Sequence, residues 1–378
     1  MPSLKALWKP LTVAPAASSA LTRSSHGLAV MQGQAFVFGG ELKPRTPVQG
    51  DLTVLDLPGA SVSCMPSTSK LADGFQHDTA GSTRILSPTS TASTPSWPAS
   101  RVGAPLVAHE DKLYLWGGRG GKDMSTFTAE AGIWEFDAQK EQWTELETKG
   151  DQPEPRSFHT MCALDGKLYL HAGCPASGRL TMLHALDLTT MTWTRLPDAP
   201  APGRGGTVLT ALPRSTSGSP LLARFGGFAG YELDGLDVYD VVKNEWTTVT
   251  ARAEGGGDGP DKRSVHALVG LGGELEWEGK RVVAVMALGE REGAPKELGH
   301  DGAYFFHDDA WALLATRSSS PSFSWLRLEA SAQTPSIPEA RGWLPSALVE
   351  GNKIIFQGGL NARNERLSDG WTLEVVVE

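Results

Sequence analysis

The chain has 378 residues, 40 % of them hydrophobic, and a formal charge of −9, so it can bury a sizeable core and is not a disordered protein. Its lysines and arginines are scattered and outnumbered by acidic residues, which excludes the basic surface that nucleic-acid binding requires. No apolar run approaches the ~20 residues that cross a bilayer, and Lys5, Lys9 and Pro10 interrupt the apolar N-terminus, so we expect a cytoplasmic protein without nucleic-acid or membrane partners.

One sequence pattern recurs along the chain. Each copy opens with Arg and a short polar stretch, and continues with an apolar strand, a tight turn and a second strand that ends in Gly-Gly. A third strand carrying Asp and a fourth carrying Trp complete the copy. The clearest example reads RVGAPLVAHEDKLYLWGG from Arg101, followed by IWEFDAQKEQWTEL. Four strands repeated at a period near ~50 residues indicate a propeller.

In chain order, the pattern predicts a short strand at 1–12 and then six four-stranded units, at 22–66, 101–147, 156–197, 204–250, 263–329 and 341–378. The last unit lacks a Trp-bearing fourth strand, and the segment ALWKPL around Trp8 supplies one. Pairing of the two would bury the exposed edges of a ring. The sequence therefore predicts an all-β, six-bladed propeller forming one domain over 1–378, closed by its N-terminal strand.

A segment rich in Ser, Thr and Pro follows the first unit. Its composition over residues 67–100 predicts a flexible insertion. Two interpretations remain open for it, a lid over the binding face and an insertion without a role.

The glycine doublets, with the Asp and Trp strands that follow them, resemble kelch repeats. The doublets stand at Gly39-Gly40, Gly117-Gly118, Gly226-Gly227 and Gly358-Gly359, and two repeats replace them by Ala172-Gly173 and Leu288-Gly289. Glycine permits close backbone approach where blades crowd together, and Trp fills the wedge between sheets. The resemblance therefore implies a kelch propeller over nearly the whole chain, the fold also found in galactose oxidase.

Two segments carry a narrower resemblance. FGGELKPRTPVQGDLTVLDL resembles the first repeat of plant nitrile-specifier and thiocyanate-forming proteins, and GEREGAPKELGHDGAYFFHDDAW resembles a pattern in kelch proteins of filamentous fungi. The plant proteins redirect unstable glucosinolate aglycones with a ferrous ion held by Glu, Asp and His. The matching stretch here, FGGFAGYELDGLDVYD, offers Glu232, Asp234 and Asp237 as metal candidates. Because imidazole is missing from this set, we expect no cofactor, with Fe(II) as the alternative.

The opening arginines and the loops after Gly-Gly are expected on one face of the propeller, where binding sites usually lie. Convergent guanidinium groups bind carboxylates, sulfate or polarised carbonyls, although they could equally lock the blades together. The candidate catalytic residues are Arg23, Arg101, Arg156, Arg263, Glu290 and His300. The candidate substrate-binding residues are Glu41, Arg45, Arg204, Phe228, Tyr231, Arg341 and Trp343. Three histidines that follow an opening arginine are expected to pack between blades: His26, His159 and His266.

These features predict a small-molecule-binding propeller of secondary metabolism that steers a reactive, largely apolar intermediate. The reaction would be a specifier-type lyase step or a pericyclic cyclisation such as a hetero-Diels–Alder reaction, with a small-molecule substrate as the partner. Positioning, exclusion of water and a donor on a developing oxyanion suffice for such steps. The alternative is a kelch protein-interaction scaffold without catalysis, since fold alone does not decide function. The sequence leaves the oligomeric state open.

Overall fold

The computed structural model describes residues 3–12, 15–57, 82–88, 97–127, 132–214, 218–272, 274–293, 297, 305–318 and 320–378, with the backbone alone at 15–17. His300 and most of the segment 67–100 lie outside these ranges. Within them the regular structure is almost entirely strand, and the helix α1 (Pro15–Leu21) is short. No helix in this part of the chain is long and apolar enough to span a membrane.

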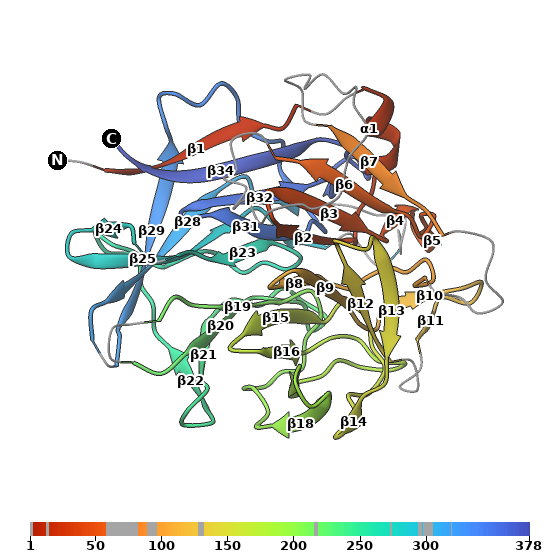
Figure 1. The fold of residues 1–378 in the computed structure, drawn as a ribbon. Helices are drawn as coiled ribbons and strands as arrows, with labels where there is room; N and C mark the ends of the chain where they lie inside the picture. The colour runs from red at the N-terminus through yellow and green to blue at the C-terminus, as the bar shows by residue number, and fades with distance from the viewer. Residues whose placement is uncertain are drawn as a thin grey trace.

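The first four sequence repeats each fold into an antiparallel sheet whose main strands are neighbours in chain order (Figure 1). The first sheet contains β2 (Gly27–Met31), β3 (Gln34–Phe38), β6 (Leu52–Asp56) and β7 (Thr83–Leu86). The second contains β8 (Leu106–His109), β9 (Lys112–Leu115), β12 (Ile133–Asp137) and β13 (Gln142–Leu146). The third contains β15 (Thr160–Leu164), β16 (Lys167–His171), β17 (Leu183–Asp187) and β18 (Thr192–Leu196), joined by β14 (Lys149–Gly150). The fourth contains β19 (Val208–Ala211), β20 (Leu221–Phe225), β21 (Leu236–Asp240) and β22 (Glu245–Val249).

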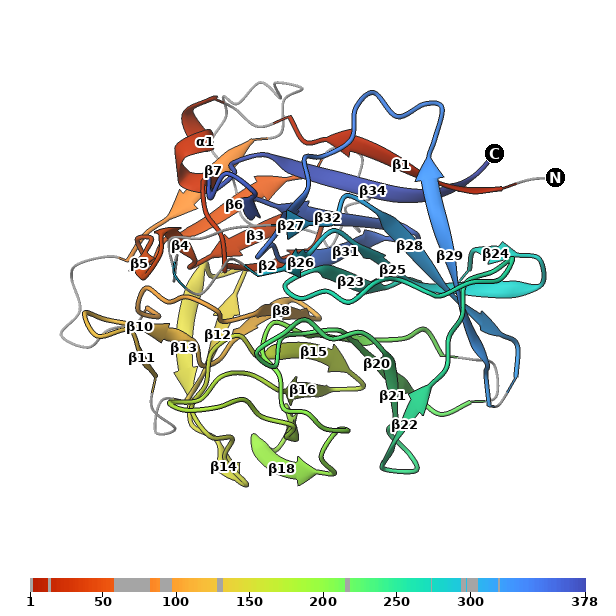
Figure 2. The same ribbon diagram turned by 180° about the vertical axis from the view of Figure 1, so that it is seen from behind.

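The last two repeats share one nine-stranded sheet of order β23-β25-β28-β29-β1-β34-β32-β31, with β24 beside β25. The fifth repeat supplies β23 (Ala267–Gly270), β24 (Glu276–Trp277), β25 (Lys280–Ala287), β28 (Ala310–Thr316) and β29 (Phe323–Ala330). The sixth supplies β31 (Ser346–Glu350), β32 (Lys353–Gln357) and β34 (Gly370–Val377). As predicted, the N-terminal strand β1 (Leu4–Pro10) pairs antiparallel with β34, from Leu4↔Val377 to Pro10↔Trp371. The two strands lie side by side in both views (Figures 1 and 2), and the chain termini lie close together.

The first strands of the repeats surround a common centre (Figure 1). Each contacts the first strand of the next repeat, in the cycle β2, β8, β15, β19, β23, β31 and back to β2. This arrangement confirms the predicted all-β propeller architecture. We call the face where first strands begin and second strands end the loop face. It carries the short pairs β4 (Glu41–Lys43) with β5 (Thr46–Pro47), β10 (Arg119–Gly120) with β11 (Ser125–Thr126), β26 (Glu290–Glu292) with β27 (Phe305–Phe306), and β30 (Arg341–Gly342) with β33 (Leu360–Asn361).

The core lies between neighbouring sheets, and the tryptophans of the fourth strands fill it. Trp143 packs against Phe38 of the preceding repeat with ring centroids 5.6 Å apart, and Trp325 packs against Phe225 at the same centroid distance. Both indoles are buried, with 1 % of each residue exposed. The structural role predicted for the repeated tryptophans is therefore seen at these joints.

A ring of backbone hydrogen bonds joins each repeat to the next at the glycine doublets. The N–H of the second doublet residue donates to the carbonyl of the next opening arginine, as Gly40 does to Arg101 at 2.8 Å. The corresponding donors are Gly118, Gly173, Gly227, Gly289 and Gly359, and the last of them donates to Arg23 of the first repeat. The repeats thus close on themselves through one identical contact per joint.

One boundary differs from the sequence prediction. The sequence predicts an insertion over residues 67–100, whereas residues 83–86 form β7 and pair with β6, from Leu52↔Leu86 to Leu55↔Thr83. Only Ile85 and Leu86 in this strand are strongly apolar, and the surrounding Ser, Thr and Pro give no strand period. The first repeat therefore has a fourth strand that the pattern did not reveal.

Candidate functional site

The opening arginines were candidates for ligand contact, and the structure places them inside the repeats. All six are buried, with at most 4 % of each residue exposed. In every repeat one terminal amino group donates to the carbonyl of the first doublet residue, at 2.8 to 3.2 Å. The residues concerned are Arg23, Arg101, Arg156, Arg204, Arg263 and Arg341. These side chains hold the end of the second strand and do not form the rim of a pocket, which corrects the sequence prediction.

In the last two repeats the guanidinium groups also pair with aspartates. Arg263 contacts both carboxylate oxygens of Asp309, at 2.7 and 3.0 Å, and Arg341 contacts those of Asp369, at 2.5 and 2.9 Å. The indole N–H of Trp311 donates to the same Asp309 carboxylate. In the first four repeats burial has the largest effect on the pKa of the opening arginine, and it lowers that pKa. For Arg101 the pKa falls to about 10. The guanidinium groups are therefore committed to structural contacts.

A second ring of backbone hydrogen bonds lies at the loop-face end of the centre. Its members are Ser25, Gly103, Phe158, Gly206, Val265 and Trp343, one per repeat, each donating its N–H to the carbonyl of the preceding member, with Ser25 donating to Trp343, at 2.7 to 3.0 Å. All six have positive φ, including the β-branched Val265 at 45°. Left-handed backbone at bulky residues is strained and persists only where surrounding contacts enforce it. We call this closed set the amide ring.

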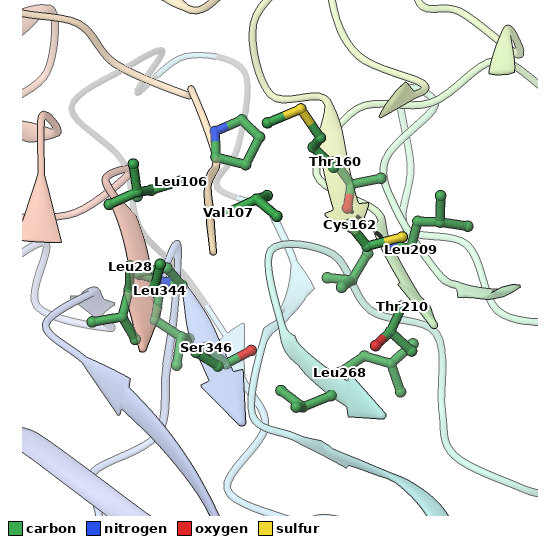
Figure 3. Close-up of a pocket in the computed structure, with 18 of the residues that line it drawn as sticks. Leu28, Leu106, Val107, Thr160, Cys162, Leu209, Thr210, Leu268, Leu344 and Ser346 are labelled. Carbon is green, nitrogen blue, oxygen red and sulfur yellow. Dashed lines mark hydrogen bonds between the residues drawn. The ribbon is translucent and has the colours of Figure 1, made fainter. Parts of the chain in front are cut away.

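Inside the amide ring, the first strands enclose a cavity of about 580 Å³. Figure 3 shows Leu28, Leu106, Leu209 and Leu268 around it, together with Thr160, Cys162 and Ser346. The Thr160 hydroxyl accepts the N–H of Leu209, so it satisfies a backbone donor on the free edge of the neighbouring first strand. Since no Asp, Glu, Lys or Arg lines the cavity among the described residues, its wall is largely neutral.

Two aromatic side chains of the amide ring meet at the loop-face end of this cavity. The rings of Phe158 and Trp343, from the third and sixth repeats, cross edge to face with centroids 5.5 Å apart. Arg119 lies over Phe158, with its Cζ 5.6 Å from the ring centroid, and its Nε donates to the Ser157 hydroxyl at 2.7 Å. The positive φ of both aromatic residues fixes where their side chains leave the backbone.

Two buried carboxyl groups lie in loops of the fourth and fifth repeats, and the Glu290 carboxyl lies beside Trp343. Glu290 directly follows the fifth doublet position and is 7 % exposed, and Glu232, from the loop after the fourth doublet, is 6 % exposed. Burial, together with the charge of Glu232, raises the pKa of Glu290 to about 8, while the Trp343 indole acts in the opposite direction. Burial also raises the pKa of Glu232. The structure thus brings together the predicted residues Glu290 and Trp343.

Two arginines that the repeat pattern did not single out lie on the loop face. Arg119 is the residue after the second doublet, and Arg179 belongs to the loop after the third. Both carry charge near the thiol of Cys174, whose pKa is raised by burial and lowered by the two guanidinium groups. The Cζ of Arg179 lies 4.7 Å from the centroid of Phe228. The position immediately after Gly-Gly was the available sequence signal for Arg119.

The remaining predicted residues are dispersed. Glu41 lies 3.5 Å from Arg366 and accepts the backbone N–H of Arg45, and the side chains of Arg45 and Tyr231 are exposed. His300 lies outside the described residues.

The proposed carboxylate set for a metal is not assembled. Asp237 forms a buried ion pair with Arg224 and accepts a hydrogen bond from Thr248 at 2.7 Å, whereas Asp234 is exposed. Among the described residues, no group of three His, Cys, Asp or Glu side chains is placed to hold a metal ion. The spacing in the sequence was misleading because Glu232 lies in the loop and Asp237 in strand β21.

Comparison with known proteins identifies a matching family and individual relatives. Residues 25–276 match the family described as KLHDC2/KLHL20/DRC7 Kelch-repeats domain. The chain is 26 % identical to N-(sulfonatooxy)prop-2-enimidothioate sulfolyase of Thlaspi arvense over 373 residues. The alignment covers 92 % of this chain and 91 % of that protein. It is 26 % identical over 298 residues to Kelch domain-containing protein 3 of Bos taurus, covering 76 % of this chain and 68 % of that protein.

Two further matches extend the comparison. Acyl-CoA-binding domain-containing protein 4 of Arabidopsis thaliana is 29 % identical over 257 residues, which make up 66 % of this chain and only 33 % of that protein. The solved structure of YjhT superposes with a TM-score of 0.62 at 14 % identity, over 97 % of this chain and 99 % of that one. The second match supports the propeller fold alone.

Proposed function

The chain belongs to the KLHDC2/KLHL20/DRC7 kelch-repeats domain family, and from this premise we propose that it is a six-bladed propeller whose loop face binds a small molecule and steers its conversion. The blade count rests on the two rings of backbone hydrogen bonds, each with one contact per repeat. This count divides the nine-stranded sheet into two blades between β29 and β1. These two strands pair only at Lys5↔Glu329 and Ala6↔Ala330, so the link between the two halves of the sheet is short.

The observation that carries the functional proposal is the buried carboxyl group of Glu290 beside Trp343, an aromatic residue that lines the neutral cavity. A carboxylic acid with a pKa near neutrality can give or take a proton under physiological conditions. Such a group, next to an aromatic pair, suits a reactive substrate that has an apolar body and one bond to be broken. A scaffold that only binds another protein has no need for it.

The two loop-face arginines extend this site toward an anionic group. Among the described residues, no ion pair or hydrogen bond occupies the guanidinium group of Arg179, and Arg119 uses only its Nε. A guanidinium group with free N–H donors binds a sulfate, carboxylate or phosphate by donating two parallel hydrogen bonds to its oxygens. We therefore expect a substrate with an anionic leaving group near Cys174 and an apolar body over Phe158 and Trp343.

The relative from Thlaspi arvense fits this chemistry, because its name describes a lyase acting on a sulfonated thioimidate. We propose that this chain catalyses a specifier-type lyase step on a reactive intermediate of secondary metabolism. A pericyclic cyclisation in the same site remains the second enzymatic possibility. We expect the protein to work in the cytoplasm without a resident metal.

The proposal is tested with N-(sulfonatooxy)prop-2-enimidothioate generated in the assay. We expect the protein to change both the rate of sulfate release and the distribution of organic products relative to a protein-free control. Replacement of Arg179 by Gln should reduce this effect at least tenfold, whereas the exposed Arg327→Gln variant serves as the matched control. A product distribution identical to the protein-free one would reject this substrate class.

A protein-interaction scaffold is the competing function. It is favoured by exposed apolar side chains on loop-face segments, namely Leu42, Tyr231 and Phe305, each between 47 and 60 % exposed. If the chain is a scaffold, replacing Tyr231 by Ser should abolish capture of a protein partner while Glu290→Gln leaves it intact. The opposite pattern, with an altered metabolite profile, supports the enzyme.

A further inference from the structure

The cavity enclosed by the first strands, which we call the axial cavity, is covered at its loop-face end. Phe158 and Trp343 stand three members apart in the closed amide ring of six, so their edge-to-face contact, with centroids 5.5 Å apart, crosses the opening of that ring. A Cβ added to Gly103, the preceding ring member, would lie 2.9 Å from Cδ1 of Phe158. The two aromatic side chains therefore separate the axial cavity from the loops of the loop face.

The opposite end of the axial cavity carries no such cover among the described residues. The fifth residue after each amide-ring member lies in a first strand, lines the cavity and is partly exposed. These residues are all small or aliphatic: Val30, Ala108, Ala163, Ala211, Gly270 and Leu348. Two positions closer to the loop face, the equivalent residues are buried in five of the six repeats. A small molecule would therefore enter from the face opposite the loop face.

Strand edges form the wall of the axial cavity, because every first strand lies at an end of its sheet. On the free side of these edges, the N–H of Leu209 donates to the Thr160 hydroxyl at 2.9 Å, and the N–H of Gly270 donates to the Thr210 hydroxyl at 2.8 Å. A hydroxyl that accepts a hydrogen bond still has its own O–H to donate. Neither O–H donates to a residue that the structure describes, so both are available to a ligand.

Ser346 adds a third hydroxyl on the other side of the cavity. It belongs to the sixth repeat, opposite the third repeat that carries Thr160, and Figure 3 shows the two residues across the cavity from each other. The equivalent position in the other five repeats is apolar: Leu28, Leu106, Met161, Leu209 and Leu268. The Ser346 side chain makes no hydrogen bond with the described residues, so folding does not account for a polar residue there.

The axial cavity has no charge to offer a ligand. No Asp, Glu, Lys or Arg is among its described lining residues. Burial lowers the pKa of the three lining histidines, so these side chains are neutral: His26, His159 and His266. An ion transferred from water to such a site loses its hydration without gaining a counter-ion. The volume of about 580 Å³ is typical of small-molecule pockets, so the chemistry favours a neutral organic molecule.

We propose that the axial cavity is a binding site for a neutral molecule with an apolar body and carbonyl or ether oxygens. The oxygens accept hydrogen bonds from the hydroxyl groups of Thr160, Thr210 and Ser346, and the apolar body fills the space between the first strands. This site lies on the other side of the Phe158–Trp343 pair from the loop-face arginines. It goes beyond the proposed lyase function and does not depend on it.

Binding is measured with prodan, a neutral naphthalene that carries one ketone oxygen and whose emission moves to shorter wavelength in apolar surroundings. Titration of prodan with the full chain should give a blue-shifted emission that saturates at one prodan per chain. Anilinonaphthalene sulfonate, an anionic naphthalene, should not displace prodan, because the axial cavity has no cation among its described lining residues. The absence of saturable prodan binding would overturn the proposal.

Two variants at Ser346 test the position of the bound probe. Ser346→Ala removes a hydroxyl that bonds to no described residue, so it should leave unfolding unchanged and weaken prodan binding by about twofold to tenfold, the contribution of one neutral hydrogen bond. Ser346→Phe, which fills part of the cavity, should abolish saturable binding. Ser177→Ala, in an exposed loop on the loop face, is the matched control and should bind prodan as the wild-type chain does.

Arg179→Gln separates the axial site from the loop-face site. It should leave prodan binding unchanged while it reduces the effect on the sulfonated thioimidate. Loss of prodan binding in this variant, or displacement of prodan by the anionic probe, would place prodan at the loop face and overturn the axial site. Unchanged prodan affinity in both Ser346 variants would overturn it as well. A chain that binds prodan in a Ser346-dependent manner and does not act on the thioimidate would count against the lyase proposal alone.

Discussion

A Cβ added to Gly117 would lie 3.0 Å from Cε1 of His159, across the joint between the second and third repeats. The same relation links Gly226 with His266 at 3.2 Å and Gly358 with His26 at 3.1 Å. The first doublet position thus needs glycine where the following repeat presents a histidine. Ala172 and Leu288 hold the same position at φ 61°, and the repeats that follow them carry Thr207 and Leu344 in place of histidine.

Replacement of Gly117 by Ala should therefore destabilise the protein by roughly 1–3 kcal/mol, because the new methyl group meets both His159 and the carbonyl of Arg156. Denaturant unfolding measures the change. Gly121→Ala is the matched control, since its φ is also positive, at 68°, and nothing lies within 4 Å of its added Cβ. Equal losses in the two variants would show that backbone strain alone, and not the histidine, requires the glycine.

The buried histidines should make the protein sensitive to acid. Burial, and then the charge of Arg156, lowers the pKa of His159 to about 3. Below pH 6.5 His159 takes up a proton in the unfolded chain but, down to about pH 3, not in the folded chain. Protonation therefore favours the unfolded chain, and the free energy of unfolding falls as the pH drops from 6.5 toward 3. The slope per histidine is about 1.4 kcal/mol per pH unit.

Thermal or urea unfolding at pH 7 and pH 5 checks this expectation. His159→Gln should flatten the pH dependence between these values, whatever its effect at pH 7. The exposed-loop variant Asp258→Asn, which alters no buried histidine, should keep the wild-type slope. A His159→Gln variant with the full wild-type slope would contradict the role of this residue.

The arginine–aspartate pairs should behave as structural elements. Removing the charge of Asp309 leaves the fully buried Arg263 without its partner, so Asp309→Asn should cost about 3–5 kcal/mol in the free energy of unfolding. The solvent-exposed pair of Arg363 with Glu365 is the control, and Glu365→Gln should leave unfolding unchanged. Urea denaturation tests both. A stable Asp309→Asn protein with altered reaction products would instead place this pair in a binding site.

The N-terminal strand should be required for a stable ring. Deletion of residues 1–12 removes the partner of β34 and the buried Trp8, which is 4 % exposed, and leaves a long unpaired edge. We expect the deleted protein to aggregate, and a synthetic peptide of residues 3–12 to restore the soluble monomer in size-exclusion chromatography. Removal of residues 1–2 alone is the control. A soluble, stable chain without residues 1–12 would mean that the pairing with β34 contributes little.

The sequence predicted the repeat architecture because its signals are local and recur. A doublet such as Gly117-Gly118 and a tryptophan such as Trp143 report backbone crowding and a wedge to be filled, and both needs return in each repeat. The direction taken by a long side chain is not encoded in this way. Arg156 could have reached outward to a ligand, and instead it bonds to Ala172, 16 residues later.

The site itself was only partly predictable for a related reason. Glu290 was identified from its loop, but its burial against the segment before Trp343 depends on how the fifth and sixth repeats pack, which no spacing in the sequence records. The meeting of Phe158 with Trp343 joins the third repeat to the sixth and follows only from closure of the amide ring. Contacts between distant repeats therefore had to be seen in the structure.

The aromatic pair over the cavity should couple the third and sixth repeats. An edge-to-face contact at 5.5 Å contributes about 0.5–1.5 kcal/mol beyond simple burial, so a double-mutant cycle of Phe158→Leu and Trp343→Leu should give a coupling of this size in urea unfolding. A matched cycle of Phe158→Leu with Trp8→Leu joins residues without contact and should be additive. If the pair also holds the substrate, each single variant should shift the product distribution while Trp8→Leu does not. If the losses in unfolding free energy of the Phe158 and Trp343 variants are additive, the two rings do not stabilise each other. In that case the proposed site would depend on one of the two rings and not on their contact.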